Sequence, residues 1–140
     1  MRPLAALALG LALAGPAQAA SVQVEVDGIE PGGGTVYVTL CRGGLDASAC
    51  TTGQDAPGTA PVRRFLFEAV EPGTYAVAAF QDANGNRQLD RTRLGLPLEP
   101  YGLSGDAGRR ARPDFAQAAL PVREPGAAVR LRLARALPRR

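Results

Sequence analysis

The residues best suited to chemistry lie in one short polar segment, from Asp82 to Asp90. Its oxygen-bearing side chains fall at the first, third, fifth and ninth positions, so alternate residues of a tight loop can point toward one centre. Calcium takes six to eight hard oxygen ligands in flexible arrangements of this kind. The candidate ligands are Asp82, Asn84, Asn86, the Gln88 carbonyl, Asp90 and, folded back from further along the chain, Glu99.

The same loop has a second interpretation. Asn and Asp side chains also hydrogen-bond their own backbone and tolerate left-handed conformations, which is a full reason to find them in a turn. The helix-flanked calcium loop has Gly at its sixth position and an acid at its twelfth, where this chain has Arg87 and Arg93. We therefore expect either a structural calcium site with a Kd on the order of 10⁻⁴–10⁻³ M or a loop satisfied by its own hydrogen bonds.

The composition of the chain restricts which catalytic sites it can form. The chain has no histidine, and all 16 of its basic residues are arginine. This excludes a Ser-His-Asp triad, a Cys-His pair and a Schiff-base lysine. A carboxylate hydrolase would use Glu99, Asp106 and Asp114, but glycoside hydrolysis needs two acids placed across a cleft. We expect surface acids, assign no catalytic residue and predict that the protein is not an enzyme.

Two further features have residue types suited to structure and binding. Cys41 and Cys50 are nine residues apart in a turn-rich segment, and we predict a structural disulfide, because the spacing is not that of a CxxC redox pair. Closing a ring of about ten residues stabilises by roughly 2.7 kcal/mol on the loop-entropy model. In the irregular segment from residue 91 onward, Tyr101, Leu103 and Phe115 are candidates for lining a groove that takes a glycan, a peptide or an envelope protein.

These candidates must be positioned by short strands. Apolar residues mark six strands, with clear alternation in several, at residues 21–26, 35–41, 62–70, 74–81, 119–123 and 127–134. Residues 42–61 read as a long loop, and residues 113–118 as a single helical turn. Glu-Pro-Gly occurs at 71–73 and again at 124–126, and each is expected to be a hairpin that pairs its flanking strands. The pattern predicts an all-β fold, a single antiparallel β-sandwich (Ig-like or prealbumin-like) of six to seven strands over residues 20–134.

The two ends of the chain read differently from this domain. Residues 1–19 have a basic start, an apolar run and a small-residue cleavage motif at Ala17-Gln18-Ala19, which is typical of a secretory signal peptide. The run is shorter than the ~20 residues of a membrane span. We expect a periplasmic or secreted protein with a basic tail at residues 135–140. The arginine clusters lack interleaved aromatic residues, so we expect no nucleic-acid partner.

An ordered series of motifs resembles the bacterial exported family DUF2141. The motifs run from Glu71-Pro72-Gly73-Thr74-Tyr75 through the Asp82–Asp90 segment, Leu94-Gly95-Leu96-Pro97, Glu99-Pro100-Tyr101-Gly102-Leu103-Ser104 and Pro113-Asp114-Phe115. The resemblance implies a small exported protein with a signal peptide and no assigned activity, and it supplies no catalytic residues. The Pro-Gly-Thr-Tyr turn is also loosely similar to transthyretin-like and collagen-adhesin-B-like sandwiches. We therefore expect a non-enzymatic exported sandwich with a calcium-stiffened loop or, alternatively, a binding module.

Overall fold

Strands provide nearly all the regular structure of this chain. The computed structural model describes residues 10, 12, 19–105 and 113–137, so most of the predicted signal peptide and the end of the predicted tail lie outside the described residues. The elements are β1 (Ala20–Asp27), β2 (Thr35–Arg42), β3 (Thr52–Pro57), β4 (Arg63–Val70), β5 (Gly73–Asp82), β6 (Tyr101–Leu103), α1 (Phe115–Ala118), β7 (Leu120–Val122) and β8 (Gly126–Arg132). Asp114 caps α1 by accepting a hydrogen bond from the Ala116 N–H, which confirms the predicted helical turn.

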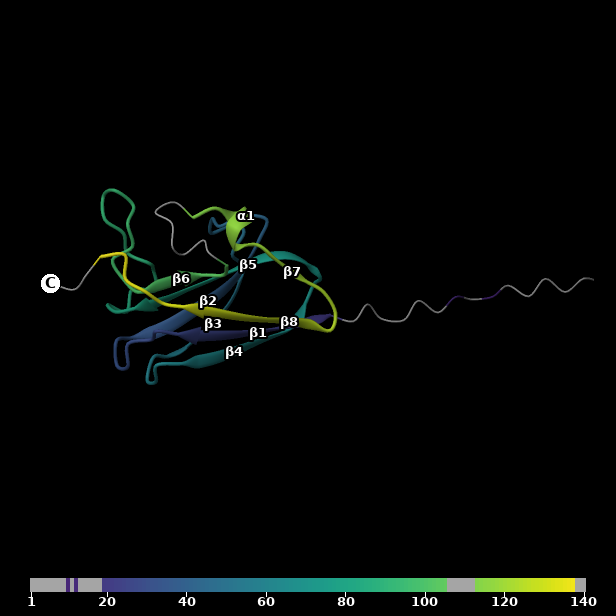
Figure 1. The fold of residues 1–140 in the computed structure, drawn as a ribbon, viewed down its shortest axis with the longest axis horizontal. Helices are drawn as coiled ribbons and strands as arrows, with labels where there is room; N and C mark the ends of the chain where they lie inside the picture. Colours follow the sequence, from purple (N-terminus) through teal and green to yellow (C-terminus); the bar gives the residue numbers. More distant parts are fainter. Residues whose placement is uncertain (1–9, 11, 13–18, 106–112, 138–140) are drawn as a thin grey trace, which may run out of the picture.

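Two stacked sheets make up the domain, as Figure 1 shows. The smaller has the order β4-β1-β8, and the five-stranded sheet has the order β3-β2-β5-β6, with β7 paired to the start of β5. This confirms the all-β sandwich, with eight strands among the described residues. One pairing departs from the antiparallel pattern, because β1 and β8 are parallel. The chain enters β8 at the end of the sandwich where β1 begins, so Gly126 lies opposite Ser21.

The core lies between the sheets and follows the predicted alternation. Its inward residues are fully or almost fully buried: Val22, Val24 and Val26 of β1, Val36, Val38 and Leu40 of β2, Phe65 and Phe67 of β4, Tyr75, Val77 and Ala79 of β5, and Leu131 of β8. Because side chains alternate across a strand, Tyr37 and Thr39 of β2 must point to the outer face of the larger sheet.

The first Glu-Pro-Gly segment is not a hairpin, which corrects the prediction. β4 and β5 belong to different sheets, so residues 71–72 carry the chain from one layer to the other. The alternation of β4 breaks before its end, where Ala69 takes a left-handed φ of 56° and the register with β1 shifts. The Tyr75 hydroxyl then donates to the Glu71 carbonyl at 2.7 Å and fixes the crossing, much as the tyrosine corner of other sandwiches does.

The second Glu-Pro-Gly segment is also a crossing between layers rather than a hairpin. β7 pairs with β5 in the larger sheet, whereas β8 pairs with β1 in the smaller one. Gly126 is required by close approach, since a Cβ there would lie 2.0 Å from the Ser21 carbonyl oxygen. Pro and Gly permit a sharp bend in either case, and only the partners of the flanking strands decide between hairpin and crossing.

Two strands were not predicted. β3 lies in the segment expected to be a loop, and five of its six residues are exposed, so it has no apolar alternation to reveal it. It forms by antiparallel backbone pairing along β2. β6 is only three residues long and contains Gly102, where a Cβ would lie 2.6 Å from the Arg132 carbonyl oxygen. Both strands owe their conformation to a neighbour rather than to their own pattern.

One end of the sandwich is held by buried polar contacts. Gln81 is 0% exposed; its side chain accepts from the Glu30 N–H at 3.0 Å and donates to the Glu30 and Gly34 carbonyls at 2.8 and 3.2 Å. Arg135, the first residue of the predicted basic tail, pairs with both carboxylate oxygens of Glu30 at 2.9 and 2.6 Å. These hydrogen bonds raise the pKa of Arg135 above its ordinary value. The turn after β1 is therefore tied to β5 and to the end of the domain.

Candidate functional site

The polar loop, Asp82–Asp90, begins where β5 ends. Asp82 is 2% exposed, and its two carboxylate oxygens accept hydrogen bonds from the Gly85 N–H at 2.9 Å and the Arg87 N–H at 2.8 Å. Arg87 takes a left-handed φ of 62°, a conformation more usual for glycine. The loop therefore has the tight form that calcium loops show at this position, although arginine replaces the glycine.

The amide side chains of the loop converge on its last acid. Asn84 Nδ2 donates to Asp90 at 2.6 Å, and Asn86 Nδ2 donates to both oxygens of Asp90 at 2.8 and 3.0 Å. The amide oxygens meanwhile accept backbone N–H groups, that of Asn86 at 3.2 Å and that of Gln88 at 3.0 Å. These bonds fix which end of each amide is oxygen, because only oxygen can accept an N–H.

The Glu99 side chain joins the two ends of the polar loop. Its carboxylate is 4% exposed and accepts the Ala83 N–H at 2.9 Å and the Asp90 N–H at 3.2 Å, thus joining both ends of the loop. Of the six predicted calcium ligands, Asn84, Asn86 and Asp90 contact one another, whereas Asp82 and Glu99 bind backbone N–H groups of the loop. Gln88 donates its backbone N–H to the Asn86 side chain. Within the described residues, no group of three or more His, Cys, Asp or Glu is placed to hold a metal ion. A calcium ion would have to displace the two amides from Asp90.

The register of the larger sheet builds a second site on its outer face. One row across the strands, here called the aromatic row, consists of Asp55, Tyr37, Phe80 and Tyr101. The rings of Tyr37 and Phe80 are stacked, with centroids 5.2 Å apart and planes 15° apart. Neither ring belongs to the inner core, and both remain partly exposed. The sheet therefore presents a band of aromatic surface across its strands.

A row of mostly smaller side chains lies next to the aromatic row. This small row consists of Gly53, Thr39, Ala78 and Leu103. Because glycine, threonine and alanine rise little above the sheet, the aromatic row borders a hollow of about 500 Å³, which is lined by both rows and which we call the groove. A volume of this size is ordinary for a ligand site.

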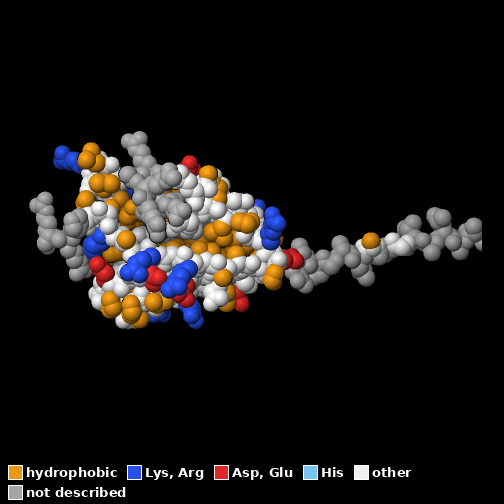
Figure 2. All heavy atoms as spheres, in the orientation of Figure 1, with side chains coloured by type: hydrophobic (Ala, Val, Ile, Leu, Met, Phe, Trp, Pro, Cys, Tyr) orange, Lys and Arg blue, Asp and Glu red, His pale blue; other side chains and the backbone are white. Residues whose placement is uncertain are grey.

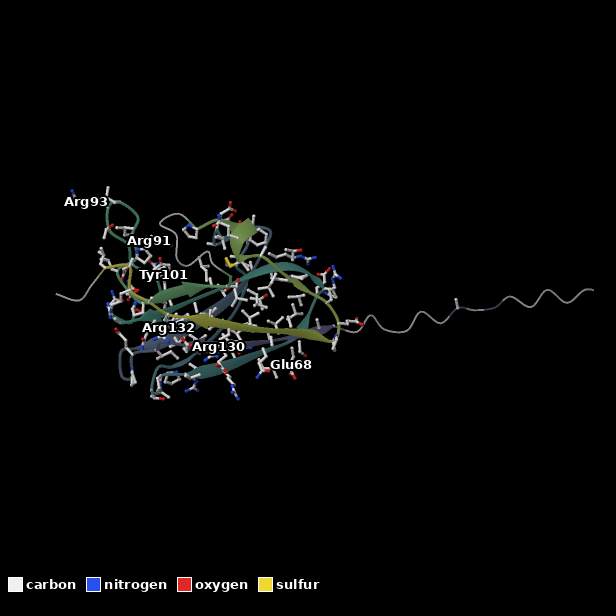
Figure 3. All side chains as sticks on the ribbon, viewed as in Figure 1. Glu68, Arg91, Arg93, Tyr101, Arg130 and Arg132 are labelled. Atoms are coloured by element: carbon white, nitrogen blue, oxygen red, sulfur yellow. A yellow bond between two sulfur atoms is a disulfide. The ribbon has the colours of Figure 1, made fainter. Side chains whose placement is uncertain are left out.

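Loops at each end of the strands extend the groove. Beyond the small row, the next paired residues, Cys41 and Ala76, are buried in a small cluster with Ala118 of α1. The loop closed by the disulfide contributes Leu45 and Cys50 to the lining of the groove. Beyond the aromatic row, the segment after β5 supplies Arg87, Leu89 and Arg91. Figure 3 shows Arg91 and Tyr101 at the same end of the molecule, with Arg93 further out at the tip of the projecting loop.

The predicted disulfide is confirmed, since Cys41 and Cys50 are bonded. Inside its ring, Asp46 Oδ1 accepts the N–H groups of Ser48 and Ala49 at 2.9 and 3.1 Å and also accepts the Ser48 hydroxyl. The hydroxyl contact is the main reason that the pKa of Asp46 lies below its ordinary value. The ring thus forms an ordered border to the groove.

Two of the three residues predicted for a groove do line it. Tyr101 and Leu103 face the hollow from β6. Phe115 instead packs in the small cluster around Cys41, Ala76 and Ala118. Tyr37 and Phe80 were missed. Tyr37 was recognisable as an aromatic residue on the polar face of an alternating strand, whereas Phe80 lies in a strand that is apolar along both faces.

Two of the three candidate catalytic acids have structural roles, and the third lies outside the described residues. Glu99 accepts two backbone N–H groups, and Asp114 caps α1. Asp106 lies outside the described residues. The structure therefore brings no pair of these acids to a common cleft within its described part.

The two outer faces of the sandwich differ in charge. On the smaller sheet, Glu25 contacts Arg64 and Arg130 at 3.1 and 3.2 Å, and Asp27 contacts Arg130 and Arg132 at 3.4 Å each. Figure 2 shows the resulting mixture of acidic and basic side chains beside β8. Exposed pairs of this kind add little stability. That face is charged but internally neutralised, in contrast to the aromatic groove of the other sheet.

Fold and site together define a small two-layer β-sandwich with a ligand-sized groove on its larger sheet. The family model described as "Uncharacterized protein conserved in bacteria (DUF2141)" matches residues 24–130, and the chain belongs to this family. Searches of curated proteins and of solved structures each found no match. The disulfide fits an extracellular or periplasmic protein. Among the described residues, no helix has the length and apolar character needed to cross a membrane.

Proposed function

We propose that this protein is an exported, non-enzymatic binding module that takes an oligosaccharide into the groove of its larger sheet. The observation that carries the proposal is the aromatic row beside the small row, with three rings bordering one hollow. The signal-peptide pattern of residues 1–19 and the disulfide support a place outside the cytoplasm.

The strand pairing favours a sugar over a peptide as the occupant. An extended peptide commonly binds by adding a strand to an exposed sheet edge. In the groove, β2 already pairs with β3 and β5, and β5 already pairs with β2 and β6. On β2 and β5, which form the middle of the groove floor, the backbone groups are therefore already paired, and a ligand lying there must be recognised by side chains. Aromatic rings offer faces and edges for the C–H surface of a sugar ring, while Thr39 and Asp55 supply polar partners.

The test is binding of a panel of neutral tri- and tetrasaccharides to the chain from residue 20 onward. Two of its three tyrosines border the groove, so we expect a change in tyrosine fluorescence together with amide shifts at Ala78 and Leu103. Phe80→Ala should weaken binding about tenfold or more, because large aromatic anchors dominate ligand contacts.

A matched control is Leu66→Ala, which truncates a side chain that is 51% exposed on the other sheet. It should leave affinity unchanged, and both variants should keep the native melting transition. Amide shifts on a peptide panel but on no sugar would replace the oligosaccharide with a peptide ligand. Equal affinity of Phe80→Ala and the unaltered chain would move the site away from the groove.

A structural calcium ion in the polar loop is a second proposal. It is supported by the approach of Asn84, Asn86 and Asp90 to one another and by the left-handed conformation of Arg87. In this role calcium would stiffen the loop that borders the groove, and a calcium titration of the melting temperature tests it.

A further inference from the structure

We infer that the ligand of the groove is an acidic oligosaccharide whose carboxylate pairs with Arg87 and Arg91. This inference rests on the proposed function and names the chemistry of its ligand. Both arginines line the groove at the side where the chain leaves β5. A guanidinium binds a carboxylate through two parallel N–H bonds, which combines affinity with fixed orientation.

The charges of these two arginines are not neutralised within the described part of the chain. Five other arginines contact an acid at 2.6–3.4 Å: Arg42, Arg64, Arg130, Arg132 and Arg135. Among the described residues, no carboxylate lies within ion-pair distance of Arg87 or Arg91. Arg91 Nη1 donates to the Gly95 carbonyl at 3.1 Å, which leaves other N–H groups of its fork for a ligand.

The backbone beneath these arginines is ordered by the polar loop. The Arg87 N–H is held by the buried carboxylate of Asp82, and Glu99 holds the Asp90 N–H directly before Arg91. Because the loop is fixed by its own hydrogen bonds, less conformational freedom is lost when a ligand binds than for arginines on a loose segment. The polar loop thus positions the two arginines for ligand binding whether or not it binds calcium.

The distribution of charge along the groove also orients the ligand. Asp55 stands at the β3 end of the aromatic row, and Tyr101 on β6 stands at the other end. Three strand spacings separate these ends, about 14 Å, which is a span of a few sugar rings. A carboxylate on the ligand is repelled by Asp55 and attracted by the arginines. Because Arg91 lies at the same end of the molecule as Tyr101 (Figure 3), we place the acidic sugar on the Tyr101 side of the groove and a neutral sugar near Asp55.

The experiment compares matched trisaccharides that differ only in one terminal C6 group, hydroxymethyl or carboxylate, in the gluco, galacto and manno series. We expect at least one acidic member to bind about tenfold more tightly than its neutral twin at low ionic strength. The preference should shrink in high salt, because exposed charge pairs are screened. Sulfated twins serve as a further arm, which separates carboxylate recognition from general anion binding.

The decisive variant is the double substitution Arg87→Gln and Arg91→Gln, with Arg63→Gln and Arg123→Gln as its control. Both pairs remove two positive charges, but only the first lines the groove. The ratio of acidic to neutral affinity should fall to about one in the groove variant and stay unchanged in the control. Equal binding of acidic and neutral twins by the unaltered chain overturns the inference and leaves the proposed function standing. Binding of no trisaccharide overturns both.

Discussion

Buried carboxylates of this protein act as acceptors for backbone N–H groups. Asp82 and Glu99 are nearly inaccessible, and each receives two N–H donors from the polar loop. Hydrogen bonds to a charged acceptor contribute about 1.5–3 kcal/mol each. The oxygen-rich spacing that suggests calcium is thus also the spacing that lets a loop of nine residues satisfy its own backbone. Both interpretations use the same residues, and they differ only in what Asp90 binds.

At this scale, calcium should raise the melting temperature of the chain from residue 20 onward. With a Kd of ~0.1 mM and ~1 mM calcium, the stabilisation is about 1.4 kcal/mol, or on the order of 5 °C for a domain of this size. Calorimetry or thermal unfolding followed by circular dichroism measures the shift. Asp90→Asn should abolish it, since it removes the carboxylate that the two amides approach. An unchanged melting temperature at several millimolar calcium would eliminate the ion and leave the self-bonded loop.

At the scale of elements, the two layers are joined by short crossings and by one buried amide. Gln81 lies at the end of β5, and its side chain satisfies three backbone groups of the turn that follows β1. A close neighbour is Gly58, where a Cβ would lie 2.6 Å from Gln81 Nε2. This one side chain therefore links β5, the turn after β1 and the segment that precedes β4.

Gln81→Leu should lower the free energy of unfolding by about 2 kcal/mol. Leucine has a similar volume but leaves the Glu30 N–H without a partner, which costs about 1–3 kcal/mol. The Glu30 and Gly34 carbonyls each lose one hydrogen bond but keep the N–H groups of Gly33 and Gly58. Urea denaturation measures the change. Gln23→Leu is the control, because Gln23 is exposed on the outer face of β1 and the same substitution there should stay within ~0.5 kcal/mol. Equal stability of the two variants would contradict the bridging role of Gln81.

At the scale of the whole molecule, the disulfide connects the sandwich to the cover on one part of its larger sheet. Cys41 is buried in β2, and the ring that it closes packs with Ala76, Ala118 and Phe115. This cover leaves the groove open beside it. Among the described residues, the disulfide and α1 therefore cover one end of this outer face, and at the other end the rings of the aromatic row stay partly exposed.

Removing the disulfide by Cys41→Ala and Cys50→Ala should lower the free energy of unfolding by about 2–3 kcal/mol. Without the cross-link, the unfolded chain gains conformational entropy. Chemical denaturation of the variant measures the loss, and the unaltered chain under reducing conditions should behave alike. The affinity for a bound trisaccharide should fall as well, since the ring borders the groove. A variant as stable as the disulfide-bonded chain would show that the ring adds no constraint.

Local patterns predicted much of this fold. Val22, Val24 and Val26 alternate with polar residues, and so do the apolar residues of β2, because burying one face of a strand requires a period of two. The cysteine spacing likewise predicted the disulfide. β3 was not predictable in this way, since its residues are exposed and its strand conformation comes from pairing with β2. The predictions of a signal peptide and of a non-enzymatic role stay predictions.

The amino-acid sequence by itself determined six of the eight strands of the described residues, their buried faces, the disulfide and the polar loop, because these depend on residues that are close along the chain. Only the tertiary structure decided that both Glu-Pro-Gly segments cross between layers, that β1 and β8 are parallel, and that Tyr37, Phe80 and Tyr101 share one row. Those features depend on which strand lies next to which and in what register. Neighbours across a sheet are remote in sequence, so the groove exists only after the strands have paired.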